Sequence, residues 1–181
     1  SAVSNGKEAV ILTTSSGSGK STLAGLLSSR GLRFFADDYV PIDNNSCLAY
    51  PFPAALSVKE GAFPLLLLFY EKLKKAELYK FRGTGKSVRY LPFPEEKNGC
   101  QPLPVRSMVF VNYNSSATNS FKKVTALEAI RRFNEEAWIS PSIDNAETFL
   151  EWFPELNFYE LVYSENEGAI KNILNLFDGQ E

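Results

Sequence analysis

Eight consecutive residues near the start of the chain, 14–21 (TSSGSGKS), have the types and the spacing of a phosphate-binding loop. Small residues let the backbone wrap around phosphate oxygens, so that several N–H groups point inward. Lys20 supplies a mobile cation for the β- and γ-phosphates, and the Ser21 hydroxyl is a hard oxygen ligand for Mg²⁺. The order approaches the Walker A pattern Gly-x-x-x-x-Gly-Lys-Ser, with Thr14 in place of the first glycine and Gly17 and Gly19 present.

A strand and a helix must hold such a loop, and the flanking sequence predicts both. Residues 9–13 (AVILT) are an apolar, β-branched run that predicts a buried strand. Residues 21–27 have helical composition, and Gly31 follows as a stop signal. A glycine-serine turn before a lysine that merely begins a helix is the simpler interpretation, but the flanking elements favour a nucleotide site. The residues predicted to bind ATP in the loop are Ser16, Gly17, Ser18, Gly19, Lys20, Ser21 and Thr22.

Asp37 and Asp38 follow the next predicted strand, 32–36. Acidic pairs often end strands as turn formers, but a strand lying beside the loop would bring this pair to Mg²⁺ and the γ-phosphate. One carboxylate would then bind the metal together with Ser21, and the other would accept a hydroxyl proton; the sequence leaves open which does which. The chain has no histidine, so carboxylates are the conventional candidates for a base. The candidate catalytic residues are therefore Lys20, Asp37 and Asp38.

These segments together resemble the catalytic domain of HPr kinase/phosphorylase and its relatives, whose fold is shared with the ATP-dependent phosphoenolpyruvate carboxykinases. The matching segments are 16–23 (SGSGKSTL), 30–38 (RGLRFFADD), 50–53 (YPFP), 56–61 (LSVKEG) and, more weakly, 159–163 (YELVY). The resemblance implies a P-loop-containing α/β fold with a mixed central sheet and flanking helices. It implies an ATP- and Mg²⁺-dependent phosphotransferase in which Asp37 and Asp38 supply the catalytic carboxylate and metal contacts and Lys59 faces the phosphates.

Two departures from the family pattern bear on the phosphate acceptor. HPr kinases carry an arginine-glycine signature where this chain has Lys59, Glu60 and Gly61, and a histidine shortly before the loop that is missing here. The resemblance therefore favours a serine-type hydroxyl on some peptide or protein over HPr itself, and it argues against phosphorylase activity. A small-molecule kinase of the shikimate or gluconate type and a nucleotide-binding regulator that does not turn over both stay open.

The distribution of basic residues also favours a polypeptide acceptor. Small-molecule kinases usually grip their substrates with clustered arginines, whereas Arg82, Arg89 and Arg106 are scattered along the chain. The stretch 77–104 consists of prolines, glycines and short strands, which could form an open surface for a peptide.

The rest of the chain predicts one α/β domain over residues 1–181. We expect a hairpin over 39–50, strands over 56–60, 88–91, 105–113 and 157–163, and helices beginning near Pro64, running from Thr125 to about 136, over 147–153, and from Ser164 to about 177. Thr125 with Glu128, and Ser164 with Glu167, have the spacing of capping boxes.

Composition bounds the remaining function classes. With 181 residues, 44% of them hydrophobic, the chain can bury one core. A net charge of −2 gives no reason to expect nucleic acid as a partner, and the apolar run 63–70 is too short to cross a membrane. Two distant cysteines predict neither a zinc site nor a disulfide framework and favour the cytoplasm. The chain begins without methionine, which suggests a fragment or a processed chain, and homo-oligomer formation stays open.

Overall fold

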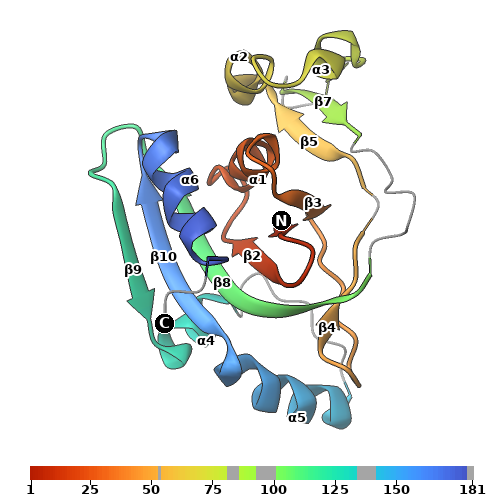
Figure 1. Ribbon diagram of the computed structural model, residues 1–181, viewed down its shortest axis with the longest axis vertical. Helices are drawn as coiled ribbons and strands as arrows, with labels where there is room; N and C mark the ends of the chain where they lie inside the picture. Colours follow the sequence, from red (N-terminus) through yellow and green to blue (C-terminus); the bar gives the residue numbers. More distant parts are fainter. Residues whose placement is uncertain (53, 81–85, 93–100, 134–141, 179–181) are drawn as a thin grey trace.

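A computed structural model describes residues 1–52, 54–80, 86–92, 101–133 and 142–178 and has a mixed β-sheet at its centre (Figure 1). The strand order is β3 (Arg33–Ala36), β1 (Ala2–Ser4), β2 (Ala9–Thr13), β8 (Leu103–Tyr113), β10 (Asn157–Tyr163) and β9 (Ser120–Val124). The three strands β2, β8 and β10 are parallel, and β1 and β9 run antiparallel to their neighbours. The short β4 (Leu48–Ala49) pairs with the start of β8. The expected α/β class with a mixed sheet is therefore confirmed.

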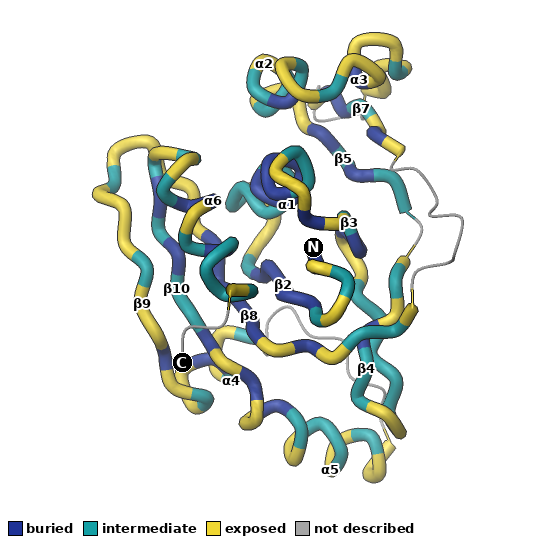
Figure 2. Tube along the Cα trace, viewed as in Figure 1, coloured by how far each residue is buried: buried dark blue, intermediate teal, exposed yellow. Residues whose placement is uncertain are grey.

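Helices cover both faces of this sheet, and strand alternation decides which residues face which helices. On one face Leu12 and Val109 pack beneath α1 (Lys20–Ser29) and α6 (Asn166–Asn175). On the other face Ile11 and Met108 pack toward α4 (Ala126–Phe133), α5 (Ile143–Trp152) and the short 3₁₀ turn η2 (Phe153–Glu155). Figure 2 shows the consequence: β2 is buried along its length, whereas α5 and β9 are largely exposed or half-buried.

A second, smaller antiparallel sheet packs on the far side of α1. It has the order β5 (Leu56–Lys59), β7 (Ser87–Leu91), β6 (Tyr79–Lys80), and the 3₁₀ turn η1 (Glu60–Ala62) and the short helices α2 (Phe63–Leu66) and α3 (Glu71–Lys75) flank it. A Cβ at Gly25 of α1 would lie 3.1 Å from side-chain carbons of both Leu56 and Leu66. Glycine therefore lets α1 lie this close to the small sheet, so that α1 is packed between two sheets.

Several predicted elements are confirmed, and the capping box of α4 is among them. The Glu128 carboxylate accepts hydrogen bonds from the N–H and hydroxyl of Thr125, and the Thr125 hydroxyl accepts one from the Glu128 N–H. The predicted hairpin is present as a β-bridge between Ile42 and Ala49. The strands predicted over 9–13 and 157–163 have the same bounds in the structure as β2 and β10.

Other predictions differ from the structure. The cap predicted for the last helix is wrong, because the Ser164 N–H and hydroxyl donate to the Asn119 side chain and Glu167 forms an ion pair with Arg30. The single helix expected from Pro64 is divided into α2 and α3. In addition, β1 and β9 were not predicted. Among the helices of the described ranges, none is both long and apolar enough to cross a membrane.

Candidate functional site

The loop between β2 and α1 presents a helix N-terminus with open N–H groups. Gly17 and Gly19 have φ angles of 93° and 95°, a region that favours glycine. Gly19 is the N-cap of α1 and provides no side-chain cap, so the first-turn N–H groups of the helix keep their capacity to bind an anion.

Thr14, which replaces the first glycine of the pattern, sits in a conformation that glycine would adopt more easily. Its φ angle is 141°. Within the part of the chain that the structure describes, the buried hydroxyls of Thr14 and of Ser18 have no hydrogen-bond partner. Threonine at position 14 therefore does not prevent the loop from forming, but its backbone conformation is strained.

Two tyrosines, at the carboxyl ends of the neighbouring strands β8 and β10, form hydrogen bonds with backbone carbonyls of the loop. The Tyr113 N–H donates to the Ser18 carbonyl at 2.9 Å, and the Tyr163 hydroxyl donates to the Gly19 carbonyl at 3.5 Å. A Cβ at Gly19 would lie 2.7 Å from the Tyr163 hydroxyl, so the tyrosine is packed directly against the loop backbone. Burial, and secondarily Tyr113, raise the pKa of Tyr163 above its ordinary value, so the hydroxyl remains a neutral donor.

Both predicted cations lie at the loop. The Lys20 ammonium donates to the carbonyl of Thr14 and, at 2.8 Å, to that of Ser15. Lys59, at the end of β5, reaches from the small sheet and donates to the Ser16 hydroxyl at 3.1 Å. Positive charge therefore comes from two separate elements and meets beside the glycines.

Asp37 is buried, with 2% of its surface exposed, and accepts four hydrogen bonds. One carboxylate oxygen accepts from the hydroxyls of Ser21 and Ser1, both at 2.8 Å. The other accepts from the N–H and hydroxyl of Ser57, both at 2.9 Å. This carboxylate fixes the Ser21 side chain and is itself fixed, which suits a supporting role better than that of a proton acceptor.

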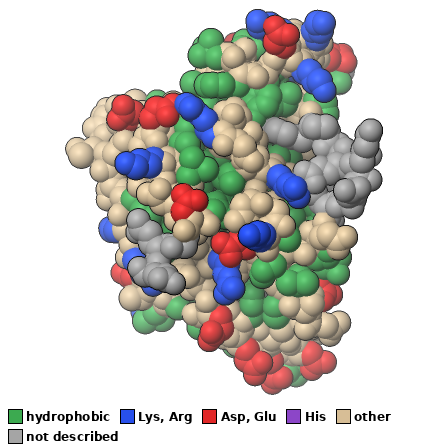
Figure 3. All heavy atoms as spheres, viewed as in Figure 1, with side chains coloured by type: hydrophobic (Ala, Val, Ile, Leu, Met, Phe, Trp, Pro, Cys, Tyr) green, Lys and Arg blue, Asp and Glu red, His purple; other side chains and the backbone are tan. Residues whose placement is uncertain are grey.

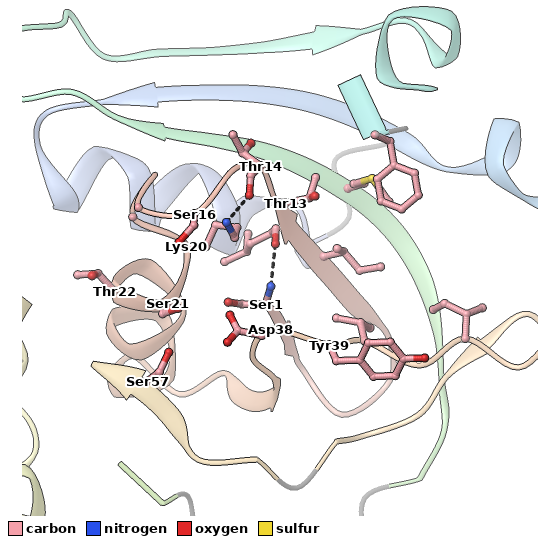
Figure 4. A pocket seen from close by; sticks show the side chains of 18 of the residues that line it. Ser1, Thr13, Thr14, Ser16, Lys20, Ser21, Thr22, Asp38, Tyr39 and Ser57 are labelled. Atoms are coloured by element: carbon pink, nitrogen blue, oxygen red, sulfur yellow. Dashed lines mark hydrogen bonds between the residues drawn. The ribbon is translucent and has the colours of Figure 1, made fainter. Parts of the chain in front are cut away.

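Asp38 has the opposite environment, because it is exposed and lines the cleft in front of the loop. In the view of Figure 4 it lies between Ser21 on one side and Tyr39 on the other. The two neighbouring carboxylates are thus separated: one faces the protein interior and the other faces the cleft.

The cleft has a volume of about 740 Å³, enough for a nucleotide and part of a second substrate. Most of the predicted site residues line it; they are Ser16, Gly17, Gly19, Lys20, Ser21, Thr22, Asp38 and Lys59. The exceptions are Ser18, whose carbonyl bonds Tyr113, and the buried Asp37.

A metal ion would have few protein ligands here. No group of three or more acidic, cysteine or histidine side chains is placed to hold a metal within the described residues. Mg²⁺ needs no such group, because it keeps several waters and takes one or two protein oxygens beside the phosphates. The Ser21 hydroxyl and the exposed Asp38 carboxylate are hard oxygen donors of that kind.

Sequence reasoning missed Ser57 and the two tyrosines. Ser57 could have been found, because it lies two residues before Lys59 and therefore on the same face of β5. Arg89 and Arg106 are engaged elsewhere: Arg89 donates to the carbonyls of Leu73 and Lys74, and Arg106 pairs with Glu8 at 3.3 Å. Arg82 lies outside the described residues.

Comparison with known proteins gave no match: no family model, curated protein or solved structure matches the chain. The resemblance to HPr kinases stays a prediction, and the geometry of the cleft is what bears on function.

Proposed function

We propose that the chain is an ATP- and Mg²⁺-dependent phosphotransferase with a P-loop fold like that of the HPr kinases, and that its acceptor is a serine hydroxyl of a peptide or protein. The observation that carries the proposal is the hydrogen bond between the Ser21 hydroxyl and the buried Asp37 carboxylate. A serine that donates its proton in this way keeps two lone pairs, and because Ser21 lines the cleft, its oxygen would be available to hold Mg²⁺ beside a bound nucleotide.

In this proposal, some residues bind the nucleotide and the metal, and Asp38 takes part in the chemical step. The N–H groups at the start of α1, with Lys20 and Lys59, would bind the triphosphate, and Ser21 would hold Mg²⁺, which would neutralise charge on the phosphates. Asp38 accepts the proton of the acceptor hydroxyl. The acceptor oxygen forms a bond to the γ-phosphorus while the bond from that phosphorus to the β–γ bridging oxygen breaks, and ADP leaves with that electron pair.

Nucleotide binding gives the first test. A non-hydrolysable ATP analogue is titrated by calorimetry with and without Mg²⁺ into wild type, Ser21→Ala and Ser21→Thr. We expect wild type to bind more tightly with Mg²⁺, Ser21→Ala to lose that gain, and Ser21→Thr, which keeps the hydroxyl, to retain it. Ser29→Ala is the matched control, because Ser29 is on the same helix and its hydroxyl donates to the Leu26 carbonyl of that helix.

Transfer is tested with labelled ATP and a size-fractionated lysate. We expect label on peptides or proteins in the presence of wild type and a rate of labelling lower by roughly 10²-fold or more with Asp38→Asn. Label confined to a low-mass metabolite would favour the small-molecule kinase, and nucleotide binding without any transfer would favour the regulator.

A further inference from the structure

The cleft continues past Asp38 into an arm with apolar walls. This acceptor arm consists of six side chains that line the cleft: Tyr39, Val40, Ile42, Met108, Phe149 and Trp152. All of them except Tyr39 belong to one apolar cluster, to which the segment after β3, strand β8 and helix α5 contribute. Because Asp38 lies between Ser21 and Tyr39 in Figure 4, a group beside Tyr39 would be on the opposite side of the carboxylate from the start of α1.

Helix α5 turns a half-covered face toward the arm. Four of its residues recur at helical spacing, line the cleft and are half-buried: Asn145, Thr148, Phe149 and Trp152. No residue of α5 is fully buried, and its outer face carries Asp144, Glu147 and Glu151, all exposed. Figure 3 shows acidic side chains gathered at this end of the molecule. The inner face thus keeps apolar surface that a ligand could cover.

The charge of the arm selects against anions. The two lysines among the described residues that line the cleft, Lys20 and Lys59, lie at the phosphate loop, whereas Asp43, which follows Ile42 of the arm, also lines the cleft. Hydrogen bonds from the Ser46 side chain and backbone hold the pKa of Asp43 below its ordinary value, so it remains an anion near neutral pH. A carboxylate or phosphate on the acceptor would face repulsion here without a compensating cation.

Exposed aromatic side chains continue the apolar surface from Tyr39 of the arm to Tyr50 and Phe52. Tyr39, Tyr50 and Phe52 are 46%, 43% and 41% exposed, and the rings of Tyr39 and Phe52 meet edge to face at 5.7 Å. Aromatic residues of this kind are typical of surfaces that bind polypeptides. A small alcohol would fill the arm and leave these rings in water, whereas an extended peptide can cover both.

We propose that the acceptor arm selects peptides in which a residue two positions from the phosphorylated serine is aliphatic or aromatic, and rejects peptides with an acidic residue there. This inference rests on the proposed function. Side chains of an extended peptide alternate between its two faces, so the residue two positions from the serine, about 6.7 Å away, shares the serine's face and can enter the arm while the serine hydroxyl stays at Asp38. Burying that side chain favours a leucine over an alanine peptide by roughly 10-fold in kcat/KM.

The test uses three peptides of equal length in which both residues two positions from the central serine are Leu, Ala or Glu. Phosphate incorporation gives kcat/KM, and titration with the non-hydrolysable ATP analogue gives nucleotide affinity separately. We expect the order Leu, Ala, Glu for wild type and a Leu-over-Ala preference reduced about 10-fold in Trp152→Ala, with nucleotide affinity unchanged. Leu150→Ala is the control, because Leu150 is on the same helix, 57% exposed and outside the cleft.

A second variant keeps the inference testable if Trp152→Ala fails to fold. Asn145→Lys places a cation at the half-exposed wall of the arm and should raise kcat/KM for the Glu peptide at least several-fold relative to the Leu peptide. Equal rates for all three peptides, or an unchanged preference in both variants, would overturn the arm's role while nucleotide affinity still supported the proposed function. Wild type that binds no nucleotide would overturn both.

Discussion

The hydroxyl of Ser21 and the carboxylate of Asp37 are joined by a hydrogen bond of 2.8 Å that links α1 to the end of β3. The strands leading to these residues are not neighbours, because β1 lies between β2 and β3 and is antiparallel to both. β2 and β3 therefore run in the same direction and end at the same edge of the sheet. This arrangement brings the metal-binding candidate and its supporting carboxylate together.

The two aspartates should respond differently to the same substitution. Asp37→Asn replaces an acceptor with an NH₂ group that faces donors, so we expect a loss of about 2–3 kcal/mol in the free energy of unfolding, measured with urea. Asp38→Asn should leave the urea midpoint unchanged and lower the transfer rate by roughly 10²-fold or more. Equal loss of stability in the two variants would contradict the division of roles.

Replacement of Lys20 should affect ligand binding more than folding. Lys20→Ala removes a charge-assisted hydrogen bond to phosphate, so affinity for the non-hydrolysable ATP analogue should fall by roughly 10- to 100-fold, with circular dichroism unchanged. Lys74→Ala, at an exposed position of α3, is the control and should bind as wild type does. If Lys20→Ala bound the analogue with wild-type affinity, the nucleotide site would have to lie elsewhere.

The packing of Tyr163 predicts a difference between two glycines. Gly17→Ala meets open space and carries only the strain of a positive φ angle, about 1 kcal/mol. Gly19→Ala adds a clash with the Tyr163 hydroxyl, so it should cost about 2–4 kcal/mol in unfolding free energy and also weaken nucleotide binding. Adding Tyr163→Phe should recover part of that loss. Similar stability of the two single variants would argue against the contact.

Substitution of Thr14 by glycine should stabilise the protein. Thr14→Gly removes a strained φ angle and a buried hydroxyl without a described partner, so we expect the free energy of unfolding to rise by about 1 kcal/mol. Nucleotide affinity should be kept or improved. Thr13→Gly, in the buried strand β2, is the matched control and should destabilise the protein. Destabilisation by Thr14→Gly would mean that Thr14 makes a contribution other than the one described.

The elements around the loop could be predicted because local signals agree there. The apolar run of β2, the helical composition of α1 and the stop at Gly31 all point to one arrangement. β1 has no such signal: three residues, Ala2–Ser4, are too few for a periodic pattern, and their burial comes from strands on both sides. β9 was missed because it alternates weakly, with two exposed lysines in the middle.

The roles of the aspartates could not be divided from the sequence. Neighbouring strand-end residues differ in which way they point, and burial depends on what approaches from elsewhere. Ser57, which supplies two of the hydrogen bonds to Asp37, belongs to a different sheet. The acceptor arm also could not be predicted from local sequence, because its side chains come from residues 39–42, β8 and α5, which are distant in the chain.

Ser57 and Lys59 lie on the small sheet, whereas the loop and Asp37 belong to the main one. The site is therefore complete only when the two sheets are packed together. We expect the small sheet to open as a unit in native-state hydrogen exchange, which would remove two of the four hydrogen bonds to Asp37. A nucleotide that contacts both Lys20 and Lys59 should then slow exchange in β5 more than in β9.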